Sequence, residues 1–241
     1  MTTPGPAANY EFLGQTVTLP VEVRHARQAS ATFLVDADAA QRIIAESGLT
    51  VTRKARGKAL ASIALVDYLQ NDLGTYHELA LAFVVDDPAG VPKGPKGSVS
   101  TLIWRLPVNG EFTCAAGRGI WGFPKWVTDV SVRFTGDRVT GVLTEDGVEV
   151  VRVVLKKGPI PLPRRPLVMN AYSFLDGVLR RTPWTTDGVG KQRIRFGGAT
   201  VIIGSGHPLA DELRALGLPK SAIVTMFDEH MQATFGAAEI I

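Results

Sequence analysis

The most informative stretch of the chain spans residues 114–126 and reads Cys114-Ala115-Ala116-Gly117-Arg118-Gly119-Ile120-Trp121-Gly122-Phe123-Pro124-Lys125-Trp126. It places Lys125 directly after a proline and among large apolar side chains. Because an apolar setting disfavours the charged ammonium, we expect the pKa of Lys125 to be lowered. A neutral lysine amine attacks carbonyl carbons to form an imine, so Lys125 is a candidate covalent catalyst. The alternative is a lysine whose stem lies on the aromatic rings while its ammonium reaches water.

The pair Gly117-Arg118 followed by Phe123-Pro124-Lys125 resembles the motif Gly-Arg-x-x-x-x-Phe/Tyr-Pro-Lys of the acetoacetate decarboxylase family. In that family the lysine after the proline forms the imine, and acetoacetate decarboxylase is a known example of an activated lysine. Residues 73–78 resemble the family segment that ends in an active-site glutamate, here Glu78. Residues 33–38 and 207–241 also fit, so the resemblance covers nearly the whole chain.

The resemblance also implies roles for individual residues. Arg27, or Arg24 in its place, matches the family arginine that binds the substrate carboxylate, and Glu78 matches an acid-base or orienting group. We expect a substrate pocket that includes Arg118, Phe123, Trp121, Trp126 and Ser62. Arg118 could instead hold its loop by pairing with a carboxylate. We expect no metal and no organic cofactor, because the four histidines lack the spacing of zinc sites.

Two positions in the motif depart from the family pattern, and a third departure is Ser62, where the family has an acidic residue. Family members usually carry a second lysine where this chain has Trp126, and a glutamate where it has Gly119. The first hypothesis is a carbon–carbon lyase that decarboxylates acetoacetate or a related β-keto acid through an imine on Lys125. The two departures favour the alternative of an aldolase-dehydratase that uses a 2-oxo acid such as pyruvate. A third reading is a non-catalytic barrel that binds a small apolar ligand.

Composition narrows the class of protein. Hydrophobic residues make up 45% of the 241 residues, which is ample for a core and argues against disorder. The net charge is +3, and no basic tract interleaves with aromatic residues, so we expect no nucleic-acid partner. Cys114 is the only cysteine, and we expect a buried structural thiol. With neither a signal-peptide pattern nor a long apolar run, we expect a cytoplasmic protein that is not bound to membranes. The family resemblance implies a homo-oligomer that acts on a small oxo acid.

The order of predicted elements indicates one domain over residues 1–241, with residues 1–10 as a flexible arm. Many short runs with strand character are separated by turn residues. One helix is predicted between a cap at Asp36 or Asp38 and Gly48, and another over residues 208–216. Asn109-Gly110 between two apolar runs predicts a hairpin, and residues 86–97 a flexible loop. This pattern predicts a mostly β protein with a few helices, either a barrel or a sandwich. The family resemblance implies a cone-like antiparallel β-barrel with its active site inside.

Overall fold

A computed structural model describes residues 8–88, 99–187 and 191–241 of the chain. Its strands and α-helices follow in the order β1 (Asn9–Phe12), β2 (Gln15–Thr18), β3 (Val21–Asp36), α1 (Ala37–Ile43), β4 (Arg53–Lys54), β5 (Lys58–Asn71), β6 (Tyr76–Val84), β7 (Val99–Val108), α2 (Glu111–Trp121), β8 (Lys125–Val127), β9 (Asp129–Thr135), β10 (Arg138–Glu145), β11 (Val148–Lys156), β12 (Ile160–Pro163), β13 (Leu167–Leu175), β14 (Val178–Thr186), β15 (Lys191–Phe196), β16 (Ala199–Ile203), α3 (Pro208–Ala215), β17 (Val224–Phe235) and β18 (Glu239–Ile240).

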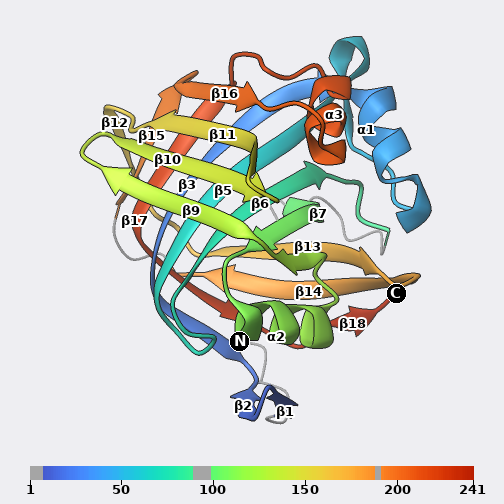
Figure 1. The fold of residues 1–241 in the computed structure, drawn as a ribbon, viewed down its shortest axis with the longest axis vertical. Coiled ribbons are helices and arrows are strands. Elements are labelled where there is room, and N and C mark those ends of the chain that lie inside the picture. The colour runs from blue at the N-terminus through green and yellow to red at the C-terminus, as the bar shows by residue number, and fades with distance from the viewer. Residues whose placement is uncertain (1–7, 89–98, 188–190) are drawn as a thin grey trace.

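Seven strands close into a barrel (Figure 1). They are hydrogen-bonded in the order β17-β3-β5-β6-β7-β13-β14, and β14 pairs again with β17 to complete the ring. The pairings are antiparallel except that β7 runs parallel to β13 and to β8. The predicted mostly β fold and its barrel are therefore confirmed.

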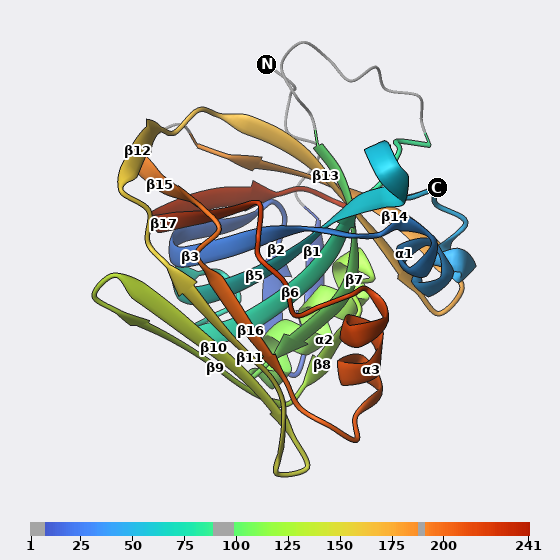
Figure 2. The same cartoon turned by 90° about the horizontal axis from the view of Figure 1, so that it is seen from above.

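A second sheet, in the order β16-β11-β10-β9, lies against the outside of β3, β5 and β6 (Figure 2). Its apolar side chains and those of α1 and α3 form one core with the outer face of the barrel. A second core fills the barrel itself, where α2 packs among the strands. Alternate residues of β6 supply the two cores: Leu79 and Leu81 face outward, whereas Tyr76 and Glu78 face inward.

The two predicted helices are confirmed. The carboxylate of Asp36 accepts a hydrogen bond from the backbone of Ala39 and caps α1, as its sequence position predicts. Helix α3 begins with Pro208, which needs no hydrogen-bond partner for its nitrogen. In the predicted arm, residues 9 and 10 belong to β1, and residues 1–7 lie outside the described residues. Most of the predicted loop 86–97 lies outside them as well.

The hairpin predicted at Asn109-Gly110 is wrong. The chain enters α2 there instead, and residues 112–116, predicted as a strand, are helical. Gly110 occupies the cap position before the helix, and the Asn109 side chain accepts a hydrogen bond from the backbone of His77. The buried positions of α2 recur at helical spacing, at 113, 114, 116, 117, 120 and 121. Helix α2 consequently presents one face to the interior of the barrel.

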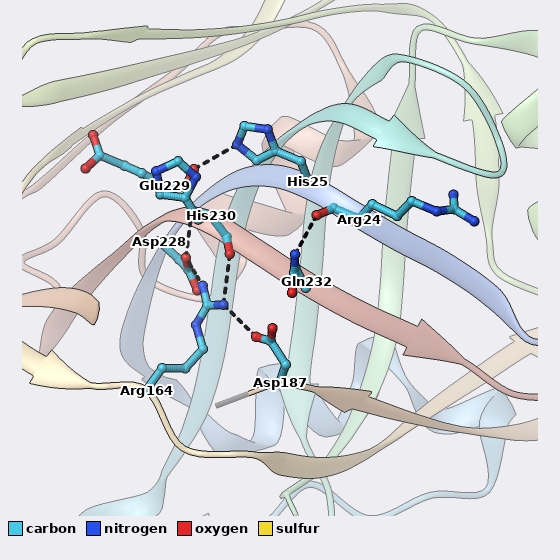
Figure 3. A network of polar contacts seen from close by, with 8 residues as sticks. All are labelled: Arg24, His25, Arg164, Asp187, Asp228, Glu229, His230 and Gln232. Atoms are coloured by element: carbon cyan, nitrogen blue, oxygen red, sulfur yellow. Dashed lines mark hydrogen bonds and ion pairs between the residues drawn. The ribbon is translucent and has the colours of Figure 1, made fainter. Parts of the chain in front are cut away.

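A buried arginine joins the elements where β17 changes partners. The first half of β17 pairs with β15 and its last three residues pair with β14, with an irregular register between the two parts. Figure 3 shows Arg164 reaching this point with its guanidinium toward Asp187, Asp228 and the carbonyl of His230. Its side chain is 5% exposed, and both carboxylates form ion pairs with it. Arg164 therefore holds together the strand ends at the seam of the barrel.

Candidate active site

Lys125 enters the barrel through a tight reversal after α2. Gly122, with a φ of 62°, adopts the left-handed conformation that ends the helix, and Pro124 follows two residues later. The chain then runs as β8 beside β7, with Lys125 opposite Leu106. The side chain of Lys125 is only 3% exposed, so it is not the solvated lysine of the alternative interpretation.

The ammonium of Lys125 is surrounded by polar and aromatic groups. Its Nζ lies 3.0 Å from Oε2 of Glu78 and donates to Oγ1 of Thr113 at 3.0 Å. It also lies 4.9 Å from the centre of the Tyr76 ring, in a cation–π position. The hydroxyl of Tyr68 donates to the other carboxylate oxygen of Glu78 at 3.2 Å. The barrel interior thus holds a buried ion pair with a hydrogen-bonding partner on each side.

The expected lowering of the pKa of Lys125 is wrong. Burial acts to lower the pKa, but the neighbouring Glu78 carboxylate and Tyr76 outweigh it, so the pKa is raised above its ordinary value. Burial also raises the pKa of Tyr76 and, with the nearby Glu78 charge, raises that of Tyr68 well above its usual range. In the resting site Lys125 is therefore charged, and the two tyrosines are neutral.

Helix α2 determines the path of the lysine side chain. A Cβ added at Gly117 would lie 2.6 Å from Cδ and 2.9 Å from Cε of Lys125, so the lysine stem occupies the space that a side chain would fill. Thr113, one helical turn earlier, meets the ammonium at the end of that stem. Arg118 donates from Nη1 to the backbone carbonyl of Lys125 at 3.0 Å. Within the matched motif, Gly117 makes room for the lysine and Arg118 holds its backbone.

Replacing Gly117 with alanine is expected to displace Lys125 and slow imine formation on the order of 10²-fold, the cost of misplacing a reacting group by about 1 Å. The measurement is the rate of borohydride trapping with an oxo acid. Gly119→Ala is the matched control on the same helix, because its new Cβ would meet the ring of Phe12 instead. Equal trapping rates in the Gly117→Ala variant and the wild type would contradict the close fit.

The aromatic residues of the predicted pocket fall into two groups. Trp121 and Phe123 stack with ring centres 5.6 Å apart and are buried in the barrel core. Trp126 follows Lys125 on the strand and lies on the opposite side, where its Nε1 donates to Glu145 at 3.2 Å and its ring packs against the outer core. Trp126 therefore does not cover the ammonium, and Tyr76 is the aromatic ring nearest to it.

The structure does not bring Arg27 to Lys125. Arg27 pairs across β3 and β5 with Asp67, which in turn pairs across β5 and β6 with His77. Because His77 and Glu78 are adjacent strand residues, the three side chains lie on the face away from Glu78. There Arg27 donates from Nε to Asp67 at 3.1 Å, and its guanidinium lies over the ring of Phe134 on β9.

The remaining predicted residues also lie apart from the ion pair. Arg24 is half exposed and bound to Asp72 at 2.6 Å. Ser62 shares the inner face with Glu78 but lies farther along β5, where its hydroxyl is 3.4 Å from that of Thr32. Three residues of the site, Thr113, Tyr68 and Tyr76, were not predicted from the sequence. Tyr76 had a usable signal, since it lies two residues before Glu78 on a strand and thus on the same face.

Other predicted features can be placed as well. Burial raises the pKa of the Cys114 thiol, as expected for a structural cysteine. In the described ranges, no group of three or more His, Cys, Asp or Glu residues is arranged to hold a metal ion. None of the helices described is long and apolar enough to cross a membrane.

The family assignment rests on the match of nearly the entire chain to one family model. The model of the acetoacetate decarboxylase (ADC) family matches residues 6–238. The chain therefore belongs to the acetoacetate decarboxylase family. No curated protein matches its sequence.

Solved structures with the same fold share little sequence with the chain. The acetoacetate decarboxylase of Legionella pneumophila is 16% identical, with a TM-score of 0.67 over 92% of this chain and 87% of that one. An acetoacetate decarboxylase-like enzyme from Sphingomonas wittichii is 14% identical, with a TM-score of 0.60 over 95% and 96% of the two chains. The enduracididine biosynthesis enzyme MppR, solved with the condensation product of pyruvate and imidazole 4-carboxaldehyde, is 17% identical, with a TM-score of 0.60 over 92% and 88%. At these identities the neighbours show that the fold is shared, and the family assignment rests on the family model.

Proposed function

We propose that the protein is an imine-forming carbon–carbon lyase that acts on a small oxo acid. The observation that carries this proposal is the buried Lys125–Glu78 pair, with 3.0 Å between Nζ and Oε2. A raised pKa leaves few neutral lysines at neutral pH, so the nucleophile must be produced by an adjacent base. Glu78 is that base, because its carboxylate already accepts a hydrogen bond from the ammonium.

The same pair accounts for the proton transfers of imine formation. The ammonium proton passes to Glu78, and the neutral amine adds to the carbonyl carbon of the substrate. The resulting carbinolamine takes this proton back on its hydroxyl and loses water. The products are a protonated imine on Lys125 and an ionised Glu78, so the charges of the site are the same before and after. The hydrogen bond from Tyr68 supports the ionised carboxylate throughout.

The protonated imine then acts as an electron sink. With a β-keto acid, the bond to the carboxylate breaks, carbon dioxide leaves, and the electron pair forms an enamine. The enamine carbon takes up a proton, and water hydrolyses the imine to free Lys125 and release a ketone. This reaction is our first candidate, because the chain belongs to the acetoacetate decarboxylase family.

Two departures from the family pattern favour the second candidate, an aldolase-dehydratase that uses pyruvate: Trp126 and Gly119 stand where family members usually have a lysine and a glutamate. Arg27 is bound to Asp67 on the other face, and Arg118 lies beside Lys125 and donates to its backbone carbonyl. MppR, which shares the fold, binds a condensation product of pyruvate. In such a reaction the same enamine attacks an aldehyde instead of a proton.

Incubation with acetoacetate or pyruvate plus borohydride is expected to add one substrate-derived mass to Lys125, as read by intact mass and peptide mapping. The imine is reduced to a stable secondary amine at the attached lysine. Arg27→Ala is expected to trap at the wild-type rate, since its side chain lies on the opposite face. Assays of carbon dioxide release and of aldehyde consumption then separate the two reactions.

An absence of any adduct at Lys125 with both acids would reject the imine mechanism and leave the non-catalytic binding barrel. If the adduct were lost only in the Arg27→Ala variant, Arg27 would again be assigned to the active site.

A further inference from the structure

The strand face that carries Glu78 opens to solvent within two residues of it. Val66 and Glu78 pair across β5 and β6 and are buried, whereas the next pair on that face, Ala64 and Ala80, is half exposed. The opposite face stays closed along the same length, with Leu65 and Leu79 both 0% exposed. The accessible surface is therefore the inner face of the barrel beside the candidate active site.

This inner face continues across six strands as one row of paired residues. Register places Ala80, Ala64, Ser30, Met226, Ile194 and Ile160 opposite one another, from β6 to β12. Directly paired residues project to the same side of a sheet. We call these six residues the cross-strand row. The side chains in the middle of the row are small, and those at its far end are apolar, with Met226 38% and Ile160 41% exposed.

Charge excludes one class of ligand from the cross-strand row. None of its six residues is charged. The pairing one step nearer to Glu78 brings in Asp228, a carboxylate already engaged by Arg164. A second anionic group on a ligand would therefore find no cation in the row to pair with it.

We propose that the carbonyl substrate of Lys125 carries an uncharged, apolar extension that lies along the cross-strand row. This inference rests on the proposed imine chemistry. With strands about 4.8 Å apart, the three steps from Ala80 to Met226 span about 14 Å. That length greatly exceeds acetoacetate and suits a medium-length alkyl chain. The methyl side chains of Ala80 and Ala64 leave room over the sheet, and Met226 supplies contact at the end.

The test is borohydride trapping with acetoacetate, β-oxooctanoate and β-oxododecanoate, measured as the concentration that gives half-maximal modification of Lys125. Each methylene removed from water is worth about fourfold in affinity. We expect the half-maximal concentration for β-oxooctanoate to be at least about tenfold below that for acetoacetate, with a further decrease for β-oxododecanoate.

Two variants locate the effect. Met226→Ser is expected to reduce the ratio between the acetoacetate and β-oxododecanoate values severalfold, and this ratio within one variant does not depend on the folded fraction. Ile202→Ser is the matched control, since Ile202 is an exposed apolar residue, 52% accessible, on the other sheet. Its ratio should equal that of the wild type.

Two failures are distinguishable. Adducts with equal half-maximal concentrations for all three acids would overturn the extended substrate while leaving the imine mechanism intact. No adduct with any of them would remove the mechanism itself. Equal ratios in the Met226→Ser variant and the wild type would show that the alkyl chain of the substrate does not lie along the cross-strand row.

Discussion

Replacing Lys125 with methionine is expected to lower the free energy of unfolding at pH 7 by about 3–5 kcal/mol, the usual cost of removing one partner of a buried ion pair. The change leaves the carboxylate of Glu78, whose side chain is 8% exposed, without its cation. Urea unfolding of both proteins at pH 7 measures the difference. Lys157→Met is a control, because its pair with Glu229 is at the surface and should be worth less than about 1 kcal/mol.

The pH dependence of this difference has a definite sign. The pKa of Lys125 is raised in the folded protein, so its contribution to stability is complete below the unfolded-state pKa of about 10.4. It is lost as the pH rises through the higher folded-state pKa. The gap between wild type and Lys125→Met should therefore be constant near neutrality and shrink above about pH 10.

A double variant separates the charge from the loss of packing. Lys125→Met combined with Glu78→Gln removes both charges and keeps an acceptor for Tyr68, so it should regain much of the lost stability. A Lys125→Met protein as stable as the wild type at pH 7 would mean that the ion pair contributes nothing to the fold.

Replacing Glu78 with glutamine is expected to lower kcat by about 10²–10⁴-fold, the typical contribution of a general acid-base group. Borohydride trapping at neutral pH should be slower, because Glu78 carries out the proton transfers of imine formation, but it should not be abolished. Without the carboxylate, burial lowers the pKa of Lys125 with less opposition, so more neutral amine is present. The variant thus separates the supply of neutral amine from the proton transfers that Glu78 carries out.

The adjacent residue provides the matched control for Glu78. His77 lies on the opposite face of β6, 3.5 Å from Asp67, and His77→Gln should turn over at the wild-type rate. A Glu78→Gln enzyme with kcat within a few-fold of the wild type would contradict the assignment of Glu78 as the proton-transfer group. A loss of trapping together with turnover would instead indicate that Glu78 is needed to position Lys125.

The sequence was sufficient to predict the fold class and the buried setting of Lys125, but helix α2 shows where local signals fail. Asn109-Gly110 is a strong hairpin signal, and Gly117 and Gly119 both lower helix propensity. The glycines are present because Lys125 and Phe12 occupy the space beside them. The buried positions 113, 117, 120 and 121 recur at helical spacing, but Thr113 and Gly117 among them carry no apolar signal in the sequence.

The wrong prediction that Arg27 lies in the active site has a comparable cause. Val21 and Val23 face the barrel interior, and simple alternation would place Arg27 there as well. The register of β3 against β5 shifts twice between Val23 and Ala26, so Ala26 takes the inner position and Arg27 points outward. A bulge of this kind depends on the partner strand and has no local sequence mark. The raised pKa of Lys125 could not be predicted for the same reason, because the carboxylate of Glu78 comes from a strand that is distant in the sequence.

The pairing of β17 with β3 has a consequence for the newly made chain. β3 ends at Asp36 and gains β5 as a neighbour early, but its other edge waits for residues 224–235. During synthesis a long strand with an unpaired edge is thus exposed until residues 224–235 have left the ribosome. Such an edge is a template for pairing with other chains. Contacts this distant in sequence also slow barrel closure. A nascent chain that ends before Val224 should therefore be prone to aggregation.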